Sequence, residues 1–144
     1  MHESRQRALV AGIGLIRVGA AIALGGAPAT FLRWEPATPT ASSMPLLLRT
    51  VGIRDLALGL GTLRAASSGS ARELEHWVGA GFVSDALDVG AGLASARTTG
   101  IRGVVSAAIA LPVAVLDLWT LAQLRRAGSE ADPTNVVAAI RARH

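Results

Sequence analysis

Four stretches of about 20 apolar residues each limit the possible folds more than any other feature of the sequence. They cover residues 8–29, 45–63, 74–96 and 101–124. A helix of about 20 apolar residues can cross a hydrocarbon layer about 30 Å thick. The segments between them are rich in Pro, Ser, Thr and Gly, which interrupt helices. The sequence therefore predicts an all-α integral membrane bundle of four transmembrane helices over 1–127, whose short connections make neighbouring helices antiparallel.

The composition supports a membrane bundle over a soluble one. Hydrophobic residues make up 51% of the 144 residues, whereas aromatic residues make up only 3% and Tyr is absent. A soluble core of this size would lack the large side chains that dominate burial energy. Sixteen glycines are present instead. Glycine destabilises soluble helices but lets membrane helices approach one another closely.

Several classes of function find no support in the residues. The chain has no cysteine, which excludes disulfides, thiolate metal sites and cysteine nucleophiles. Its fourteen basic residues are all arginine and are scattered among few aromatic residues, a pattern that argues against nucleic-acid binding. Two Gly-x-Gly segments do not follow strands, and no Ser, His and Asp set has the spacing of an acyl-transfer site. We therefore expect a non-enzymatic protein without a cofactor or a resident metal.

The first apolar segment also resembles a cleaved secretory signal. Arg5 and Arg7 precede it, and small residues near Pro28 imitate a cleavage site. A signal core is an uninterrupted apolar run, however, and Arg17 interrupts this one. We expect the segment to be retained as a transmembrane helix.

The arginines at the ends of the segments predict the orientation of the chain. With the N-terminus in the cytoplasm, Arg33, Arg97 and Arg102 lie outside and eight arginines lie inside. The eight are Arg5, Arg7, Arg64, Arg72, Arg125, Arg126, Arg141 and Arg143. In membrane proteins the loops on the cytoplasmic side carry the excess of basic residues. We therefore expect a protein of the cytoplasmic membrane with both termini in the cytoplasm. Trp34, Trp77 and Trp119 fall near segment ends, where tryptophan favours the membrane interface.

Residues 128–144 form the predicted cytoplasmic tail. Asp132 can cap a helix in which Pro133 takes the first position. We expect a short amphipathic helix here, whose arginines suit anionic lipid headgroups.

Seven charged residues in the interior of the apolar segments are the candidate functional residues. They are Arg17, Arg49, Arg54, Asp55, Asp85, Asp88 and Asp117. A charged side chain at a helix centre costs about 2.5 to 3.5 kcal/mol on insertion scales, so seven facing lipid would cost on the order of 20 kcal/mol. These residues are therefore expected to face one another inside the bundle.

Helical spacing and depth suggest how the charges pair. Each segment has one stripe of small and polar residues, and the aspartates of the third segment share such a stripe. The simplest network has Arg17 and Arg54 bridging Asp55 and Asp85. In the same network Arg49 reaches Asp88, which completes the charge network of the first three segments. Because adjacent residues diverge by about 100° on a helix, Arg54 and Asp55 are expected to contact different neighbouring helices.

Two roles for this network remain open at the level of sequence. Ion pairs can hold together a bundle that lacks large side chains. Carboxylates in a membrane can also form a proton or ion relay, although neighbouring arginines oppose proton uptake by an aspartate. Asp117 lies nearer the cytoplasmic side and is the candidate for a titrating site or for a contact with another subunit. A metal site at Asp85 and Asp88 would need His76, which lies about 13 Å away along the helix.

The segments RTVGIRDLALGLGTL and GFVSDALDVGAGL resemble those of a family of small actinobacterial integral membrane proteins. The resemblance covers residues 8–126 and implies four helices, with the arginine and aspartate pair in the second and aspartates in the third. The chain is also similar to the LucB-type accessory subunits of mycobacterial Mce-type lipid importers. That resemblance implies a larger membrane complex, such as a lipid importer, as the partner.

We therefore expect an accessory or stabilising subunit of a larger membrane assembly, with a lipid transporter of the Mce type as the leading candidate. The alternative is a small homo-oligomeric proton-coupled transporter or channel that uses Asp85, Asp88 or Asp117. A soluble helical protein is a third class, which requires the charged residues to lie on an outer, water-exposed surface.

Overall fold

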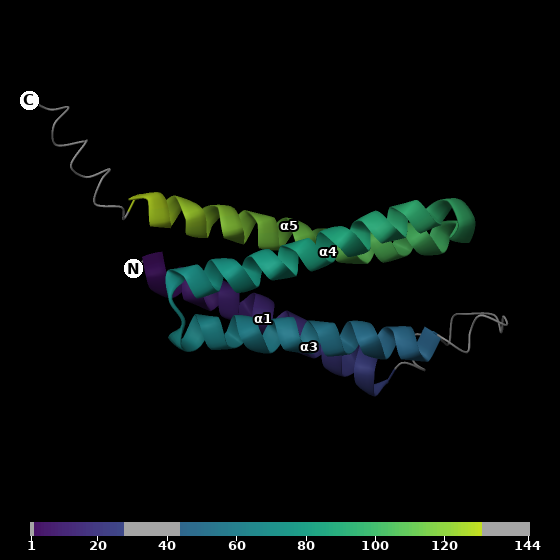
Figure 1. The fold of residues 1–144 in the computed structure, drawn as a ribbon, viewed down its shortest axis with the longest axis horizontal. Helices are drawn as coiled ribbons and strands as arrows, with labels where there is room; N and C mark the ends of the chain where they lie inside the picture. The colour runs from purple at the N-terminus through teal and green to yellow at the C-terminus, as the bar shows by residue number, and fades with distance from the viewer. Residues whose placement is uncertain (1, 28–43, 131–144) are drawn as a thin grey trace, which may run out of the picture. The chain divides into compact units, whose positions relative to one another are not determined.

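The computed structural model describes residues 2–27 and 44–130, and this part of the chain is all-α. Its helices, shown in Figure 1, are α1 (His2–Gly26), α3 (Met44–Ser68), α4 (Ala71–Thr99) and α5 (Ile101–Glu130). The four helices match the four apolar segments of the sequence, and the all-α prediction is confirmed for the described residues. The last residues of the first segment, Trp34 and the predicted tail helix after Glu130 lie outside the described residues.

The chain divides into two compact units, with the boundary between Ser68 and Gly69. In the first unit α1 packs against α3, and in the second α4 packs against α5. We call these the first and the second helix pair. The prediction of a single domain over 1–127 stays a prediction.

Glycines let the backbones of the first helix pair nearly touch. A Cβ atom added at Gly59 would lie 2.9 Å from the carbonyl oxygen of Gly14, and one added at Gly52 would lie 3.1 Å from that of Ala21. Near the open end of the pair, Arg7 donates to the carbonyl oxygen of Ala66. These contacts run in opposite directions along the two helices, so α1 and α3 are antiparallel. Small residues take the place of large core side chains here, as the composition predicts.

In the second helix pair, glycines likewise let the backbones approach closely, near the end where the turn joins α4 to α5. A Cβ atom added at Gly92 would lie 2.8 Å from the backbone of both Gly103 and Ala107. The turn between α4 and α5 consists of Gly100, whose φ of 63° lies in the left-handed region that favours glycine. One residue therefore reverses the chain, and α4 and α5 pack directly as an antiparallel pair.

The helices extend beyond the apolar segments at most ends. The predicted turn after Arg64 is mostly helical, since α3 continues to Ser68 and α4 begins at Ala71. Ser70 caps α4: its side chain accepts from the backbone N–H of Glu73, and Glu73 accepts from the backbone N–H of Ser70. Apolar runs mark the part of a helix that suits hydrocarbon, whereas the helix ends where capping groups satisfy its backbone.

Large apolar side chains are exposed on every described helix. Leu15, Ile53, Leu87 and Ile109, one from each helix, are each more than half exposed. Two segments are long and apolar enough to cross a membrane, Glu3–Gly26 and Gly103–Ser129. Only 28% of the most apolar part of each segment is buried, unlike the mostly buried core helix of a soluble protein.

The other two described helices, α3 and α4, are less apolar or carry more charged residues over a comparable length. They carry most of the charges predicted to lie inside the bundle, and these charges lower their hydropathy. Arg49, Arg54 and Asp55 lie in α3, and Asp85 and Asp88 lie in α4. The described residues therefore form an all-α architecture with two helices that are long and apolar enough to cross a membrane.

Candidate functional site

Three of the predicted charged residues meet in the first helix pair. Nη1 of Arg17, from α1, lies 3.8 Å from Oδ1 of Asp55, from α3. The Nε and Nη2 atoms of Arg54 donate to the same oxygen at 3.2 and 3.1 Å. Two guanidinium groups thus surround one carboxylate. We call Arg17, Asp55 and Arg54 the arginine–aspartate cluster.

The cluster is largely shielded from the surroundings. Arg17 is 3% exposed and Asp55 is 9% exposed, whereas Arg54 is half-buried. On α3, close by along the chain, the hydroxyl of the buried Thr62 donates to the carbonyl oxygen of Leu58. The polar groups on the inner face of this helix pair are therefore paired within the chain, which is what burial of polar groups requires.

The predicted contact between Arg17 and Asp55 is present, and Arg54 also contacts Asp55, as the predicted network has it. That Arg54 and Asp55 contact different neighbouring helices stays a prediction, and within α3 the two side chains contact each other directly. The arginine side chain is long enough to fold along its own helix and reach the carboxylate of the next residue. Divergence of the Cα–Cβ bonds therefore does not separate the terminal groups of a long side chain.

The aspartates of the second helix pair are also withdrawn from the surface. Asp85 is 6% exposed and Asp117 is 0% exposed, and Asp88 is half-buried. Arg49, which the sequence assigns to Asp88, is exposed. The bridges from Arg17 and Arg54 to Asp85, and from Arg49 to Asp88, stay predictions.

The described residues do not bring together three side chains that could hold a metal ion. His76 instead packs against its neighbour Trp77, with ring centroids 5.8 Å apart in an edge-to-face arrangement. The alternative in which His76 joins Asp85 and Asp88 around a metal gains no support.

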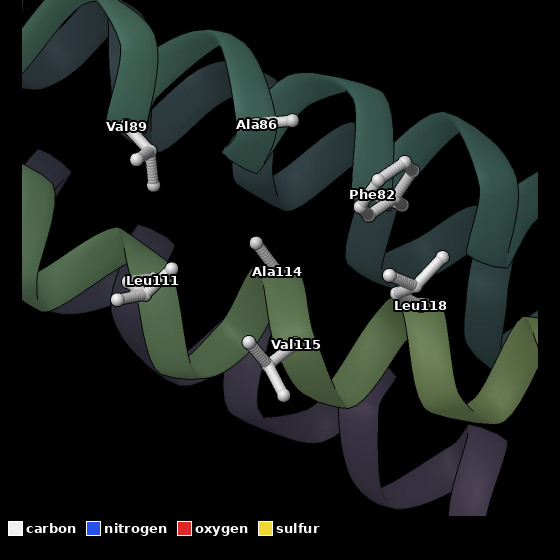
Figure 2. Close-up of a pocket in the computed structure, with 7 residues that line it drawn as sticks. All are labelled: Phe82, Ala86, Val89, Leu111, Ala114, Val115 and Leu118. Carbon is white, nitrogen blue, oxygen red and sulfur yellow. The ribbon is translucent and has the colours of Figure 1, made fainter.

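An apolar groove between α4 and α5 is a site that sequence reasoning missed. Its volume is about 250 Å³, and its lining is shown in Figure 2. The lining residues are Phe82, Ala86, Val89, Leu111, Ala114, Val115 and Leu118. The signal in the sequence was the helical spacing of these residues, with alanines opposite one another between larger side chains. Such a pattern is easily taken for an ordinary lipid-facing surface.

Comparisons of the chain with protein-family models, with curated proteins and with solved structures gave no match.

Proposed function

We propose that the chain is a multi-pass protein of the cytoplasmic membrane that acts as a non-enzymatic accessory or stabilising subunit of a larger assembly. The observation that carries the proposal is the inverted distribution of side chains in the first helix pair. Arg17 and Asp55 are buried, while Leu15 and Ile53 are more than half exposed. A soluble helix pair would favour the reverse arrangement, since water solvates charge and excludes apolar surface.

The same distribution supports membrane crossing by α3 and α4. Their charges lower their hydropathy, but Asp55 and Asp85 are buried and apolar residues such as Leu60 and Leu87 are exposed. Charged residues in membrane helices are usually turned inward, paired, and covered by an apolar outer face. On this basis α1, α3, α4 and α5 all span the membrane, with both termini in the cytoplasm.

A role in stabilising partners fits the close packing of the helix pairs. At the contacts of Gly14 with Gly59 and of Gly92 with Gly103 the backbones are too near one another for a solute to pass between the two helices. The wide apolar surface offers lipids and neighbouring membrane proteins a place to pack. The assembly we favour is an Mce-type lipid importer, because the chain as a whole resembles the accessory subunits of such importers.

Affinity isolation from native membranes tests the proposal. The tagged full chain, extracted in mild detergent, should bring down the permease and ATPase subunits of a lipid importer in fixed ratio. An untagged chain from the same strain controls for adventitious capture. Isolation of the chain alone as a homo-oligomer that moves protons in liposomes would refute the proposal.

That last outcome describes the second candidate, a small proton-coupled transporter. The full burial of Asp117 and the near-full burial of Asp85 favour it, because carboxylates inside a membrane are the usual parts of proton pathways. The test is proton flux into liposomes that contain the purified chain. Loss of the flux in Asp117→Asn, together with unchanged flux in Ser106→Ala on the same helix, would establish this second candidate.

A further inference from the structure

The apolar groove of the second helix pair has the dimensions of a site for a hydrocarbon chain. Figure 2 shows Phe82 and Leu118 at one end of it, and Val89 and Leu111 at the other. Seven residues of helix separate Leu111 from Leu118, which is about 10.5 Å along the axis. A volume of about 250 Å³ over that length gives a cross-section of about 25 Å². A single extended acyl chain has a cross-section of this size.

Small side chains create the hollow between the two helices. Ala86 of α4 and Ala114 of α5 lie between the larger residues at the two ends (Figure 2). Ala114 is buried, whereas the rim residues Leu111, Val115 and Leu118 are each half exposed or more. The groove is thus open along its side, and none of its lining residues is polar.

The groove is too small to admit the body of a transmembrane helix. A helix with its side chains is about 10 Å across, so a 10 Å length of it occupies about 800 Å³. That is about three times the volume of the groove. A helix could lie over the rim but could not enter.

Positive charge continues the line of the groove along α5. Leu111, Leu118 and Arg125 are spaced at seven residues and therefore share one face of the helix. Arg125 and Arg126 are both exposed, and the half-exposed Trp119 lies between them and the groove along the helix. Arginine binds phosphate well, and tryptophan favours the depth of the headgroups.

The spacing along α5 matches the depth of one leaflet. Fourteen residues separate Leu111 from Arg125, which is about 21 Å of helix. Half of a bilayer that is about 40 to 45 Å thick, headgroups included, is also about 21 Å. A lipid whose phosphate meets Arg125 would therefore place its acyl chain along Leu118, Val115 and Leu111.

We propose that this groove and the two arginines form a binding site for one anionic phospholipid of the cytoplasmic leaflet. One acyl chain lies between α4 and α5, and Arg125 and Arg126 bind the phosphate. The site depends on α5 crossing the membrane and does not depend on membership of an importer, so it goes beyond the function proposed above.

Quenching of Trp119 fluorescence by brominated lipid tests the site in the full chain. Trp34→Phe and Trp77→Phe leave Trp119 as the reporter. Vesicles of phosphatidylcholine contain a minor fraction of phosphatidylglycerol with brominated acyl chains. Quenching should exceed that expected from the bulk fraction of brominated lipid, and we call the ratio of the two the enrichment. Brominated phosphatidylcholine at the same fraction should give no excess.

Substitutions separate the groove from the headgroup contacts. Arg125→Gln and Arg126→Gln should each lower the enrichment about fivefold, as expected for one basic residue at an anionic surface. Ala86→Phe, which fills the groove, should abolish the enrichment. Its matched control is Ala94→Phe, at another exposed position of α4, and Arg97→Gln is the control for the charge changes. Both controls should behave as the parent does.

Three outcomes would overturn the proposal. The first is quenching in the parent that follows bulk composition. The second is an equal loss of enrichment in Ala86→Phe and Ala94→Phe. If circular dichroism shows that Ala86→Phe has lost helix, Ala86→Leu takes its place as a milder variant that fills the groove. The third is excess quenching that disappears as the ratio of protein to lipid in the vesicles rises and returns in Ala86→Phe. That result would assign this face to a second copy of the chain. Failure of the chain to co-isolate with an importer would change none of these quenching results.

Discussion

Arg17 of α1 and Asp55 of α3 approach to 3.8 Å, between Nη1 and Oδ1, within the first helix pair. The same carboxylate oxygen accepts from Arg54 at 3.1 Å, so Asp55 serves two guanidinium groups. The three residues are therefore not equivalent. Loss of either arginine leaves Asp55 a partner, whereas loss of Asp55 removes the one carboxylate that both guanidinium groups share.

This asymmetry predicts the ranking of single variants. Asp55→Ala should lower the free energy of unfolding by about 3 to 5 kcal/mol, the usual cost of breaking a buried pair from one side. Arg17→Ala should lower it by less, because Arg54 still neutralises Asp55. The double variant should be more stable than the sum of the two losses implies, with a coupling of about 0.5 to 3 kcal/mol. Unfolding of the purified chain in mixed micelles, followed by circular dichroism, measures these values.

The exposed pair of Glu3 and Arg7 is the matched control. Its charged atoms are 3.1 Å apart, but the two side chains are 79% and 30% exposed. Removal of Glu3 as Glu3→Gln should change the free energy of unfolding by less than about 1 kcal/mol. Equal effects of Glu3→Gln and Asp55→Ala would show that the arginine–aspartate cluster is not buried in the membrane protein.

Sequence reasoning found Arg17 and Asp55 because the cost of a charge in hydrocarbon leaves few alternatives to pairing. It could not fix that Arg54 and Arg17 share one carboxylate oxygen, because helical geometry fixes the direction of Cβ but not the reach of a long side chain. The helices themselves were predictable from apolar length alone. Their ends were not, since capping and interfacial polarity determine where a helix stops.

The close approach of Gly59 to Gly14 predicts a large penalty for a single methyl group. A Cβ atom at residue 59 would lie 2.9 Å from the carbonyl oxygen of Gly14 and 3.0 Å from the backbone nitrogen of Val18. Backbone atoms cannot move aside as a flexible side chain can. Gly59→Ala should therefore separate α1 from α3 and destabilise the chain by about 1 to 3 kcal/mol, measured by the same unfolding titration.

Gly19→Ala on α1 is the corresponding control. No atom lies within 4 Å of the position its Cβ would take, and the residue is exposed. Since alanine favours a helix over glycine, this variant should be at least as stable as the parent. A loss of stability in Gly19→Ala equal to that in Gly59→Ala would contradict close packing at Gly59.

The cap of α4 gives a prediction on a smaller scale. Ser70→Ala removes the acceptor for the backbone N–H of Glu73 and should cost about 1 kcal/mol. Ser67→Ala, an exposed serine of α3 before the turn, should cost less because it removes no cap. Hydrogen exchange of the first turn of α4 should rise in Ser70→Ala only. The Ser-x-x-Glu spacing from Ser70 to Glu73 is typical of a capping box at the start of a helix. The small residues around it indicate only a turn.

The α3–α4 turn distinguishes four membrane crossings from two. If only α1 and α5 crossed, α3 and α4 would both lie outside the cell, together with the turn at Gly69. If all four helices cross, that turn is cytoplasmic, whereas the α4–α5 turn at Gly100 is outside in both cases. Single cysteines can report the difference because the chain has none of its own. In intact cells an impermeant maleimide should label Thr98→Cys and spare Ser67→Cys until the membrane is opened. Labelling of both positions in intact cells would reduce the number of crossings to two and would place the charges of α3 and α4 outside the hydrocarbon.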